Sequence, residues 1–273
     1  YKRQPLSIGT MHFTGIGGIG MSGIAEILFE LGYDVQGSDM SENANVHRLR
    51  EKGIRVIAGQ SAENVENAAL VVISTAIKAD NPEVVAAKER FIPVVHRAEM
   101  LGELMRLRWS IAVAGTHGKT TTSSILAHLL RESGKKITAF LGGISSNFGS
   151  NFISEGNEYI VVEADEFDRS FLTLHPDLLC ITSMDADHLD IYQNVENLET
   201  SFQSFATLVS SPNQRWVREG LDLSGVKFGT SKHAEVRVEH VRIENGHYVF
   251  DFHSKDQILK DLQLRLPGEH NLM

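Results

Sequence analysis

The sequence predicts an α/β fold in which two domains, each built on a mainly parallel sheet, follow one another along the chain. From Met11 onward, short β-rich apolar segments alternate with amphipathic helical segments, which is the pattern of βαβ units. One glycine-rich turn follows an apolar strand near the start, and a second follows another strand near the middle. The length of 273 residues, 42% of them hydrophobic, allows two ordinary domains with buried cores.

The first domain, residues 1–108, is predicted to be a doubly wound, Rossmann-like domain. We expect its strands at residues 11–14, 34–37, 55–57, 70–74 and 93–95, and its helices at residues 20–31, 44–52, 82–90 and 96–107. Five strands with helical crossovers in a segment of this length are typical of an open parallel sheet. We place the domain boundary near Arg108.

The second domain, residues 109–273, is predicted to resemble a P-loop ATPase. We expect strands at residues 111–114, 136–140, 158–163 and 178–182, and a helix at residues 119–132. Beyond Val226 the apolar residues alternate with period two, which indicates antiparallel strands completing a mainly parallel sheet: Val236, Val238, Val241, Ile243, Tyr248 and Phe250. The segment at residues 210–225 is irregular and carries no clear pattern.

The first glycine-rich turn, Gly15-Ile16-Gly17-Gly18-Ile19-Gly20, fits the pattern G-x-G-x-x-G between a strand and a helix. Glycines there let the backbone approach a pyrophosphate, and the helix N-terminus adds amide donors. Asp39 ends the next predicted strand, where an acid often binds a ribose. NAD, FAD and UDP-sugars all carry a pyrophosphate, so the ligand stays open; alone, the motif favours a nicotinamide-dependent oxidoreductase.

The second turn, residues 115–122 (GTHGKTTT), has the features of a phosphate loop. In such loops the backbone amides surround the phosphates, the lysine (here Lys119) reaches the β and γ oxygens, and the following hydroxyl (here Thr120) binds Mg²⁺. The loop is a shortened form, because Val113 stands where the full pattern has its first glycine. Two phosphate-binding modules in one chain favour a reaction between ATP and a second nucleotide-linked substrate over hydride transfer.

Acidic residues gather between Glu163 and Asp190, where eight carboxylates accompany one arginine, Arg169. A solvated acidic face is the simple interpretation, and a divalent cation site is the alternative. Glu163 ends an apolar strand, which is where a carboxylate would meet Mg²⁺ held by Thr120. We expect its neighbours Asp165, Glu166 and Asp168 to be solvated. His188 could be a metal ligand or an ordinary histidine.

Composition excludes other classes. The chain has 26 Lys and Arg against 35 Asp and Glu, a net charge of −9, which argues against a nucleic-acid surface. No apolar run is long enough to span a bilayer, and no signal peptide is recognisable, so we expect no membrane partner. With one cysteine, Cys180, no intrachain disulfide is possible, and we expect a cytoplasmic protein in which Cys180 is a small buried apolar residue.

Five segments in this order resemble the motifs of the Mur ligase family: residues 11–23, 115–122, 163–166, 187–190 and 267–271. The resemblance implies a bacterial, ATP-dependent, peptidoglycan-precursor ligase. ATP would phosphorylate the lactyl carboxylate of UDP-N-acetylmuramate, and the amine of L-alanine would attack the acyl phosphate. A family relative that attaches murein tripeptide to the same nucleotide is the nearest alternative, and a nicotinamide-dependent oxidoreductase is the more distant one.

The resemblance also implies roles for residues. Lys119, Glu163 and His188 would be catalytic, and Mg²⁺ would be bound by Thr120, Glu163 and His188. ATP would be contacted by Gly115, Thr116, His117, Gly118, Lys119, Thr120, Thr121, His270 and Asn271. The UDP-sugar would be contacted by Gly15, Gly17, Gly18, Ile19, Gly20, Ser38, Asp39, Ser74, Thr75, His96 and Arg97.

Family members have a third, C-terminal domain that helps to bind the amino acid. This chain ends just after the fifth motif, so we expect a two-domain portion that binds the nucleotides but does not complete ligation alone. Later-acting ligases of the family carry a modified lysine after the histidine ligand. This sequence has Gln203 and no lysine in that region, consistent with alanine addition.

Overall fold

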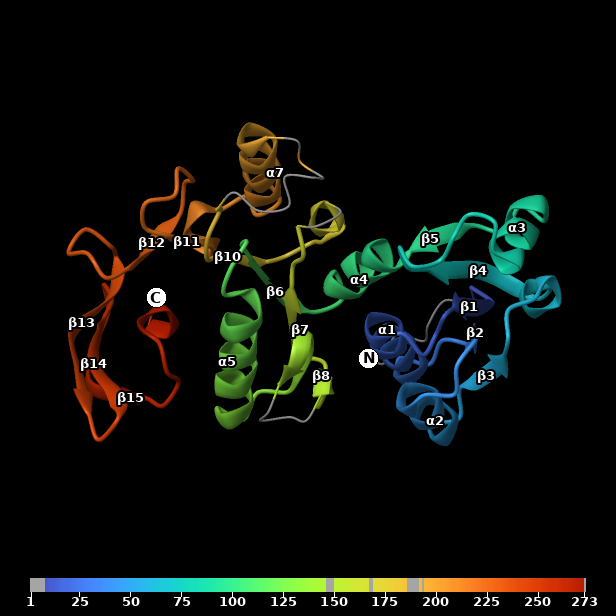
Figure 1. Ribbon diagram of the computed structural model, residues 1–273, viewed down its shortest axis with the longest axis horizontal. Coiled ribbons are helices and arrows are strands. Elements are labelled where there is room, and N and C mark those ends of the chain that lie inside the picture. The colour runs from blue at the N-terminus through green and yellow to red at the C-terminus, as the bar shows by residue number, and fades with distance from the viewer. Residues whose placement is uncertain (1–7, 146–149, 167–168, 186–191, 193, 273) are drawn as a thin grey trace. The chain divides into compact units, whose positions relative to one another are not determined.

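The computed structural model describes residues 8–145, 150–166, 169–185, 192 and 194–272. The chain divides into two compact units, Tyr1–Leu104 and Met105–Met273, which run from blue to teal and from green to red in Figure 1. The expected boundary near Arg108 falls in the short connection between helix α4, which ends at Met105, and strand β6, which begins at Trp109.

Unit 1 alternates strands and helices. Its elements are β1 (Thr10–Thr14), α1 (Ile19–Glu30), β2 (Val35–Asp39), α2 (Ala44–Glu51), β3 (Arg55–Ala58), the 3-10 helix η1 (Ala62–Val65), β4 (Ala68–Ile73), α3 (Pro82–Glu89), β5 (Val94–His96) and α4 (Arg97–Met105). The five strands form one sheet in the order β3-β2-β1-β4-β5, and every neighbouring pair is parallel. The predicted doubly wound domain is confirmed.

The strand order of unit 1 fixes where a ligand can bind. The chain moves outward from β1 to β2 and β3, then returns past β1 to β4 and β5. Loops leaving β1 and β4 therefore turn to opposite faces of the sheet, and in open α/β sheets the carboxyl ends of two such strands are where ligands bind. The glycine-rich turn follows β1, and Ser74 and Thr75 follow β4, so the fold brings these predicted ligand contacts to one edge.

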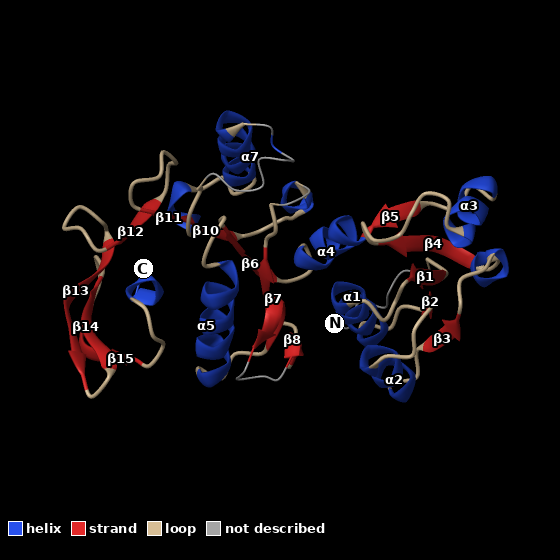
Figure 2. Cartoon of the chain, viewed as in Figure 1, coloured by secondary structure: helices blue, strands red, loops and turns tan. Residues whose placement is uncertain are grey.

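Unit 2 has a larger, mixed sheet (Figure 2). Its elements are β6 (Trp109–Ala114), α5 (Lys119–Glu132), β7 (Ile137–Ser145), β8 (Ser150–Ser154), β9 (Tyr159–Glu163), η2 (Ser170–Thr173), β10 (Leu178–Ile181), α7 (Val195–Thr207), η3 (Pro212–Gln214), β11 (Arg215–Arg218), β12 (Val226–Gly229), β13 (Val236–Glu244), β14 (His247–His253), β15 (Ile258–Leu264) and η4 (Glu269–Leu272). The strand order is β15-β14-β13-β12-β11-β10-β6-β9-β7-β8.

The sheet of unit 2 is parallel from β7 to β13 and antiparallel at both edges, where β8 pairs with β7 and β13 to β15 form a meander. The predicted mainly parallel sheet with some antiparallel strands is confirmed. Strands β8, β11 and β12 and helix α7 have no counterpart among the expected elements. Strands β11 and β12 have four residues each, too few to show a period.

The meander explains a break in the apolar alternation. The spacing changes from two to three between Val238 and Val241. In the structure the register of β13 against β14 shifts between Glu239 and Arg242, and His240 between them has a left-handed backbone with φ of 50°. The extra residue is a β-bulge, which shifts the alternation of the strand by one residue, so that Val241 and Ile243 follow Val238 at odd spacing.

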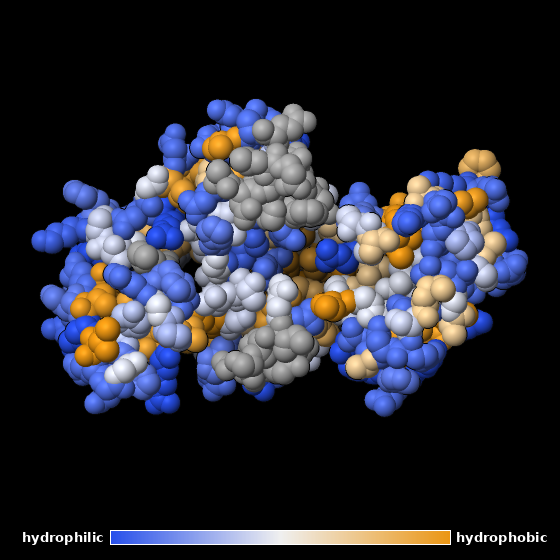
Figure 3. Space-filling model, viewed as in Figure 1, coloured by the Kyte–Doolittle hydropathy of each residue, from blue (hydrophilic) through white to orange (hydrophobic). Residues whose placement is uncertain are grey.

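The core beside the second glycine-rich turn lies between α5 and the sheet. Helix α5 packs on β6, β7 and β9, and its fully buried Ala127 meets Ile111, Ile137 and Val161 from those strands. This packing fixes the start of α5 at the carboxyl end of β6. Farther along the sheet, exposed apolar side chains gather on β13 and β15 (Val241, Ile243, Ile258 and Leu259), in the region at the left of Figure 3.

Candidate functional site

The glycine-rich turn of unit 1 is held by the end of strand β2. The amides of Gly15 and Ile16 both donate to the carbonyl of Ser38, at 2.8 and 2.9 Å. Gly15 has φ of 75°, a conformation that favours glycine. Helix α1 begins four residues later. The amides of its first turn have no acceptor within the helix and can therefore bind an anion.

Asp39 is engaged by its own surroundings. Its Oδ2 accepts the amide of Gly17 at 2.8 Å, and its Oδ1 accepts the amide and hydroxyl of Ser41 at 2.9 and 3.0 Å. Both carboxylate oxygens thus stabilise the turn itself. An oxidoreductase of the expected kind would direct this acid at a ribose, so the observed geometry disfavours that alternative.

The other residues of unit 1 that were predicted to contact the UDP-sugar differ in how exposed they are. Thr75 is exposed and Ser74 half-buried after β4, and Ile19 is 63% exposed at the start of α1. Arg97 begins α4, and a Cβ built on Gly20 would lie 2.7 Å from its guanidinium. A positive side chain therefore lies over the N-terminus of α1.

His96 and Ser38 face inward. His96 Nδ1 accepts the amide of Ala98 at 3.3 Å, while its Nε2 is buried and has no hydrogen-bond partner among the described residues. The Ser38 hydroxyl is fully buried and donates to Glu83 at 2.8 Å. The Ser38 side chain therefore points into unit 1 and helps to hold the turn, although we expected it to lie near the uridine.

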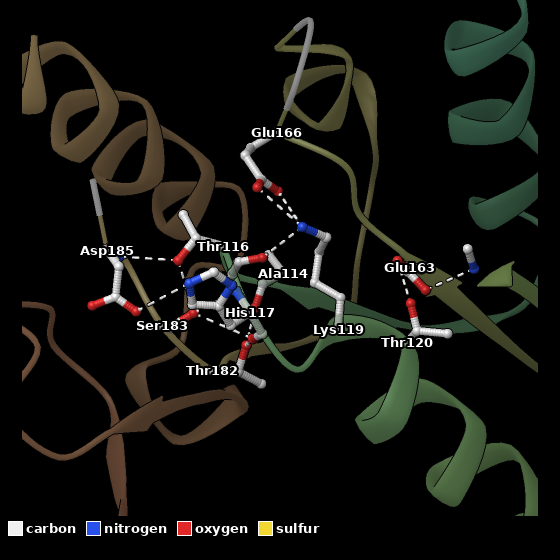
Figure 4. A network of polar contacts seen from close by, with 12 residues as sticks. Ala114, Thr116, His117, Lys119, Thr120, Glu163, Glu166, Thr182, Ser183 and Asp185 are labelled. Atoms are coloured by element: carbon white, nitrogen blue, oxygen red, sulfur yellow. Dashed lines mark hydrogen bonds and ion pairs between the residues drawn. The ribbon is translucent and has the colours of Figure 1, made fainter. Parts of the chain in front are cut away.

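The phosphate loop of unit 2 connects β6 to α5 and is fastened to the end of β10 (Figure 4). The amide of His117 donates to the Ser183 hydroxyl at 2.7 Å, and the Thr182 hydroxyl donates to the carbonyl of His117 at 2.5 Å. Gly115 has φ of 137°, and a Cβ there would collide with the Thr182 hydroxyl. Only glycine fits this approach of two backbone segments.

Lys119, the first residue of α5, is bound inside the loop. Its Nζ donates to the carbonyl of Gly115 at 2.7 Å and to the two carboxylate oxygens of Glu166 at 3.0 and 2.9 Å. The lysine side chain is 13% exposed and that of Glu166 is fully buried. We expected Glu166 to be solvated, and this prediction is wrong, because the segment that follows β9 places the carboxylate beside the lysine ammonium.

Thr120 and Glu163 come together as predicted. The Thr120 hydroxyl donates to Glu163 Oε1 at 2.9 Å, and the amide of Gly142 donates to Oε2 at 2.7 Å. A Cβ on Gly142 would collide with the Glu163 carboxylate, so this glycine of β7 leaves the space in which the carboxylate lies. A hydroxyl and a carboxylate are hard oxygen donors of the kind that Mg²⁺ prefers, and the pair fits such an ion.

The structure does not bring the other predicted metal ligand and the neighbouring acidic residues together in the described part of the chain. His188 and Asp168 lie outside the described residues, and Asp165 is exposed. Among the described residues no three His, Cys, Asp or Glu side chains form a group that could hold a metal. Thr120 and Glu163 are therefore the two predicted ligands whose arrangement the structure describes.

Other predicted ATP contacts surround the loop. Thr116 is buried and bonds the Ser183 hydroxyl at 2.9 Å, whereas His117 projects outward, with Nε2 3.9 Å from Asp185 Oδ2. Gly118 precedes α5 with φ of 82°, and Thr121 lies half-buried in its first turn.

His270 and Asn271 belong to the turn η4. Asn271 lines an apolar pocket of about 490 Å³ that also includes Thr182, so this turn and the loop support share one pocket. Cys180 lines it too and is half-buried, and burial raises the pKa of its thiol to about 12. The thiol therefore stays protonated at neutral pH, as expected for an apolar residue.

Several supporting residues had no predicted role: Gly142, Glu166, Thr182, Ser183 and, in unit 1, Glu83. The Gly142-Gly143 pair lies within a strand, where glycine signals a close approach of another group. Glu166 lies in the motif at residues 163–166, which did not indicate its contact with Lys119, and Thr182, Ser183 and Glu83 belong to no predicted motif. No helix in the described part of the chain is long and apolar enough to cross a membrane.

Two α/β units, each with a glycine-rich turn between a central strand and a helix, have the architecture of nucleotide-binding proteins. Comparison with protein families agrees. Residues 10–109 match the model described as "Mur ligase family, catalytic domain", and residues 113–273 match "Mur ligase middle domain". The chain belongs to the Mur ligase family, as its five ordered motifs predicted.

Similar proteins include the UDP-N-acetylmuramate–L-alanine ligases of Chelativorans sp. (strain BNC1), 48% identical, and Acidiphilium cryptum (strain JF-5), 46% identical. Both alignments include 99% of this chain. The chain spans 62% and 60% of the length of these two relatives.

Two solved structures are also similar. The UDP-N-acetylmuramate–alanine ligase of Thermotoga maritima is 31% identical with a TM-score of 0.77, over 96% of this chain and 62% of that one. The UDP-N-acetylmuramate:L-alanyl-γ-D-glutamyl-meso-diaminopimelate ligase of Neisseria meningitides is 25% identical with a TM-score of 0.82, over 96% of this chain and 89% of that one. The fold is common to both kinds of ligase, so it does not separate them.

Proposed function

We propose that the protein carrying this chain is an ATP-dependent ligase that joins L-alanine to the lactyl carboxylate of UDP-N-acetylmuramate. The observation that carries the proposal is the grouping of Lys119, Thr120 and Glu163 at the start of α5. A lysine amine, a hydroxyl and a carboxylate at a phosphate loop are the groups that bind a triphosphate with its magnesium ion. The 48% identity to an alanine-adding ligase supports the choice of substrates.

In the proposed reaction, an oxygen of the lactyl carboxylate attacks the γ-phosphorus of ATP, and ADP leaves. The amine of L-alanine then attacks the carbonyl carbon of the acyl phosphate. The carbon–oxygen bond to phosphate breaks, an amide forms, and the amine loses a proton. Phosphoryl transfer of this kind depends mainly on positioning and on neutralising charge.

The described residues supply these two functions. The loop amides and Lys119 would bind the phosphates of ATP, and the rigid attachment of the loop to Thr182 and Ser183 fixes their direction. Thr120 and Glu163 would hold Mg²⁺, which when bound neutralises charge on the β and γ phosphates. Glu163 is itself oriented by the amide of Gly142.

Unit 1 would bind the UDP-sugar. The first-turn amides of α1 would bind the diphosphate, and the guanidinium of Arg97 over Gly20 would add a charged donor to the same group. Arg97 begins α4, so its backbone is fixed by the helix while the side chain reaches α1. Thr75, exposed after β4, lies at the sheet edge where the sugar would continue.

The test is phosphate release from ATP by the complete protein. We expect release only when both UDP-N-acetylmuramate and L-alanine are present. Replacing L-alanine with the tripeptide L-alanyl-γ-D-glutamyl-meso-diaminopimelate separates the two kinds of ligase, and faster release with the tripeptide would favour the alternative. Equal release with either substrate omitted would contradict both.

A further inference from the structure

Glu83, in the first turn of α3, is a charged side chain at the centre of unit 1, and its surface exposure is zero. Its Oε2 accepts from His12 Nε2 at 3.0 Å, from the Thr14 hydroxyl at 2.6 Å and from the Ser38 hydroxyl at 2.8 Å. Its Oε1 accepts from Asn64 Nδ2 at 2.7 Å. Four donors from β1, β2 and η1 therefore meet on one carboxylate.

The hydrogen bonds fix the proton positions of this cluster. Gln36 Nε2 donates to the carbonyl of Asn64 at 2.9 Å, so this atom is the amide nitrogen, and its second hydrogen points to His12 Nδ1 at 3.3 Å. His12 therefore accepts at Nδ1, carries its proton on Nε2 and donates it to Glu83. The carboxylate receives four donors and is the acceptor in every contact.

The charge of Glu83 follows from this arrangement. Burial by itself would raise the pKa of the carboxyl, but the hydrogen bonds from His12, Thr14 and Asn64 hold the pKa of Glu83 below its usual value of 4.5. The group is ionised at neutral pH. Removing it would leave the buried donors of His12, Thr14 and Ser38 without this acceptor.

The cluster is joined to the glycine-rich turn at two points. Thr14 is the residue directly before Gly15. Ser38 gives its hydroxyl to Glu83, while its carbonyl receives the amides of Gly15 and Ile16. The Glu83 carboxylate therefore sets the position of the Ser38 carbonyl. Through this carbonyl it also sets the path of the turn into α1.

We infer that Glu83 is a positioning residue for the anion site at the start of α1: it contacts no ligand and acts through Ser38 and Thr14. The inference rests on the proposed function in one respect, that the anion is the diphosphate of a UDP-sugar. A change at Glu83 alters the direction of amides that bind this ligand and leaves the phosphate loop of unit 2, on a separate compact unit, as it is.

The experiment measures the steady-state kinetics of the complete protein with Glu83→Gln. The glutamine side chain keeps the shape of glutamate but has no charge. Its NH2 group is a donor, and it would face donors that now contact a carboxylate oxygen. We expect KM for UDP-N-acetylmuramate to rise on the order of tenfold, with kcat and KM for ATP unchanged. The matched control is Glu89→Gln, at an exposed carboxylate on the same helix, which should change none of the three constants.

Two further measurements separate positioning from general loss of structure. Hydrogen exchange of the Gly15 and Ile16 amides should become faster in Glu83→Gln, while exchange in the body of α1 stays as in the wild type. Ser38→Ala removes the link and leaves Glu83 with three donors, so it serves if Glu83→Gln does not fold. It should raise KM for UDP-N-acetylmuramate in the same direction.

The outcomes are distinct. A folded Glu83→Gln variant with wild-type KM for UDP-N-acetylmuramate would overturn the inference, as would an equal loss of affinity for ATP. Titration of the wild-type protein with UDP and with UDP-N-acetylmuramate distinguishes failure of the role inferred for Glu83 from failure of the proposed function. If the wild type binds neither, the proposed function fails; if it binds both and the variant does too, the role of Glu83 fails.

Discussion

The ammonium group of Lys119 donates to Glu166 through both carboxylate oxygens, at 3.0 and 2.9 Å, and to the carbonyl of Gly115 at 2.7 Å. An ammonium group has three hydrogens, and these three acceptors use all of them. A phosphate oxygen can therefore reach the lysine only by displacing one acceptor. Glu166 and the nucleotide compete for the same donor.

Replacing Glu166 with glutamine should separate stability from ATP binding. Breaking this buried pair should lower the free energy of unfolding by about 3–5 kcal/mol. Affinity for a non-hydrolysable ATP analogue should rise by about tenfold, because one competing charge-assisted hydrogen bond is lost. Urea denaturation and calorimetric titration measure the two effects. Weaker analogue binding by the folded variant would show that Glu166 orients the lysine for phosphate instead.

Lys119→Ala should abolish ATP-dependent phosphate release and leave binding of UDP-N-acetylmuramate as in the wild type. The lysine supplies the positive charge of the phosphate loop, and the UDP-sugar is assigned to the other unit. Calorimetric titration with each nucleotide makes the comparison. Lys255→Ala, at an exposed lysine between β14 and β15, is the control and should behave as wild type. Undiminished phosphate release by Lys119→Ala would refute the assignment of the loop.

Gly142 and Gly143 form a matched pair in β7. A Cβ on Gly142 would collide with the Glu163 carboxylate, whereas a Cβ on Gly143 would lie 3.6 Å from Thr120 Cγ2, an ordinary contact. Gly142→Ala should move Glu163 from Thr120 and raise the Mg²⁺ concentration needed for half-maximal activity at least about tenfold, the effect of losing one charged contact. Gly143→Ala should change it little, and equal effects would argue against Glu163 as a magnesium ligand.

Arg97→Ala should weaken binding of UDP and of UDP-N-acetylmuramate, because it removes a guanidinium from the N-terminus of α1. We expect a loss of about tenfold to a hundredfold, the range for a charge-assisted hydrogen bond to phosphate. The affinity should also depend less on ionic strength than in the wild type. Arg90→Ala, which removes an exposed ion pair with Glu66, is the control. Unchanged UDP affinity in Arg97→Ala would exclude the contact.

Glu83 should make the stability of the protein sensitive to acid. Its pKa is lowered in the folded state, so its contribution is present above the usual value of 4.5 and is lost as the pH falls through the lower folded value. The difference in unfolding free energy between wild type and Glu83→Gln should be constant above about pH 5 and shrink below pH 4.5. Urea denaturation across this range measures it, and a difference independent of pH would contradict the prediction.

Local patterns predicted much of this fold. The expected helix at residues 119–132 is observed with the same bounds, because an apolar stripe and a phosphate-loop turn both mark it. The expected strands of unit 1 are within two residues of those observed at either end. The bulge at His240 was not predicted, and the structure explains the break in the spacing of apolar residues there.

The sequence by itself determined the two α/β units, the strands and helices next to their glycine-rich turns, and the strand-end position of Glu163 near Thr120, because periodicity and strand-end position are local properties of the chain. Only the tertiary structure decided which ordinary polar residues support the loops. Glu166 reaches Lys119 across 47 positions, and Glu83 reaches Ser38 across 45. No spacing encodes such contacts, since they arise where separate strands end side by side and a buried charge must find donors.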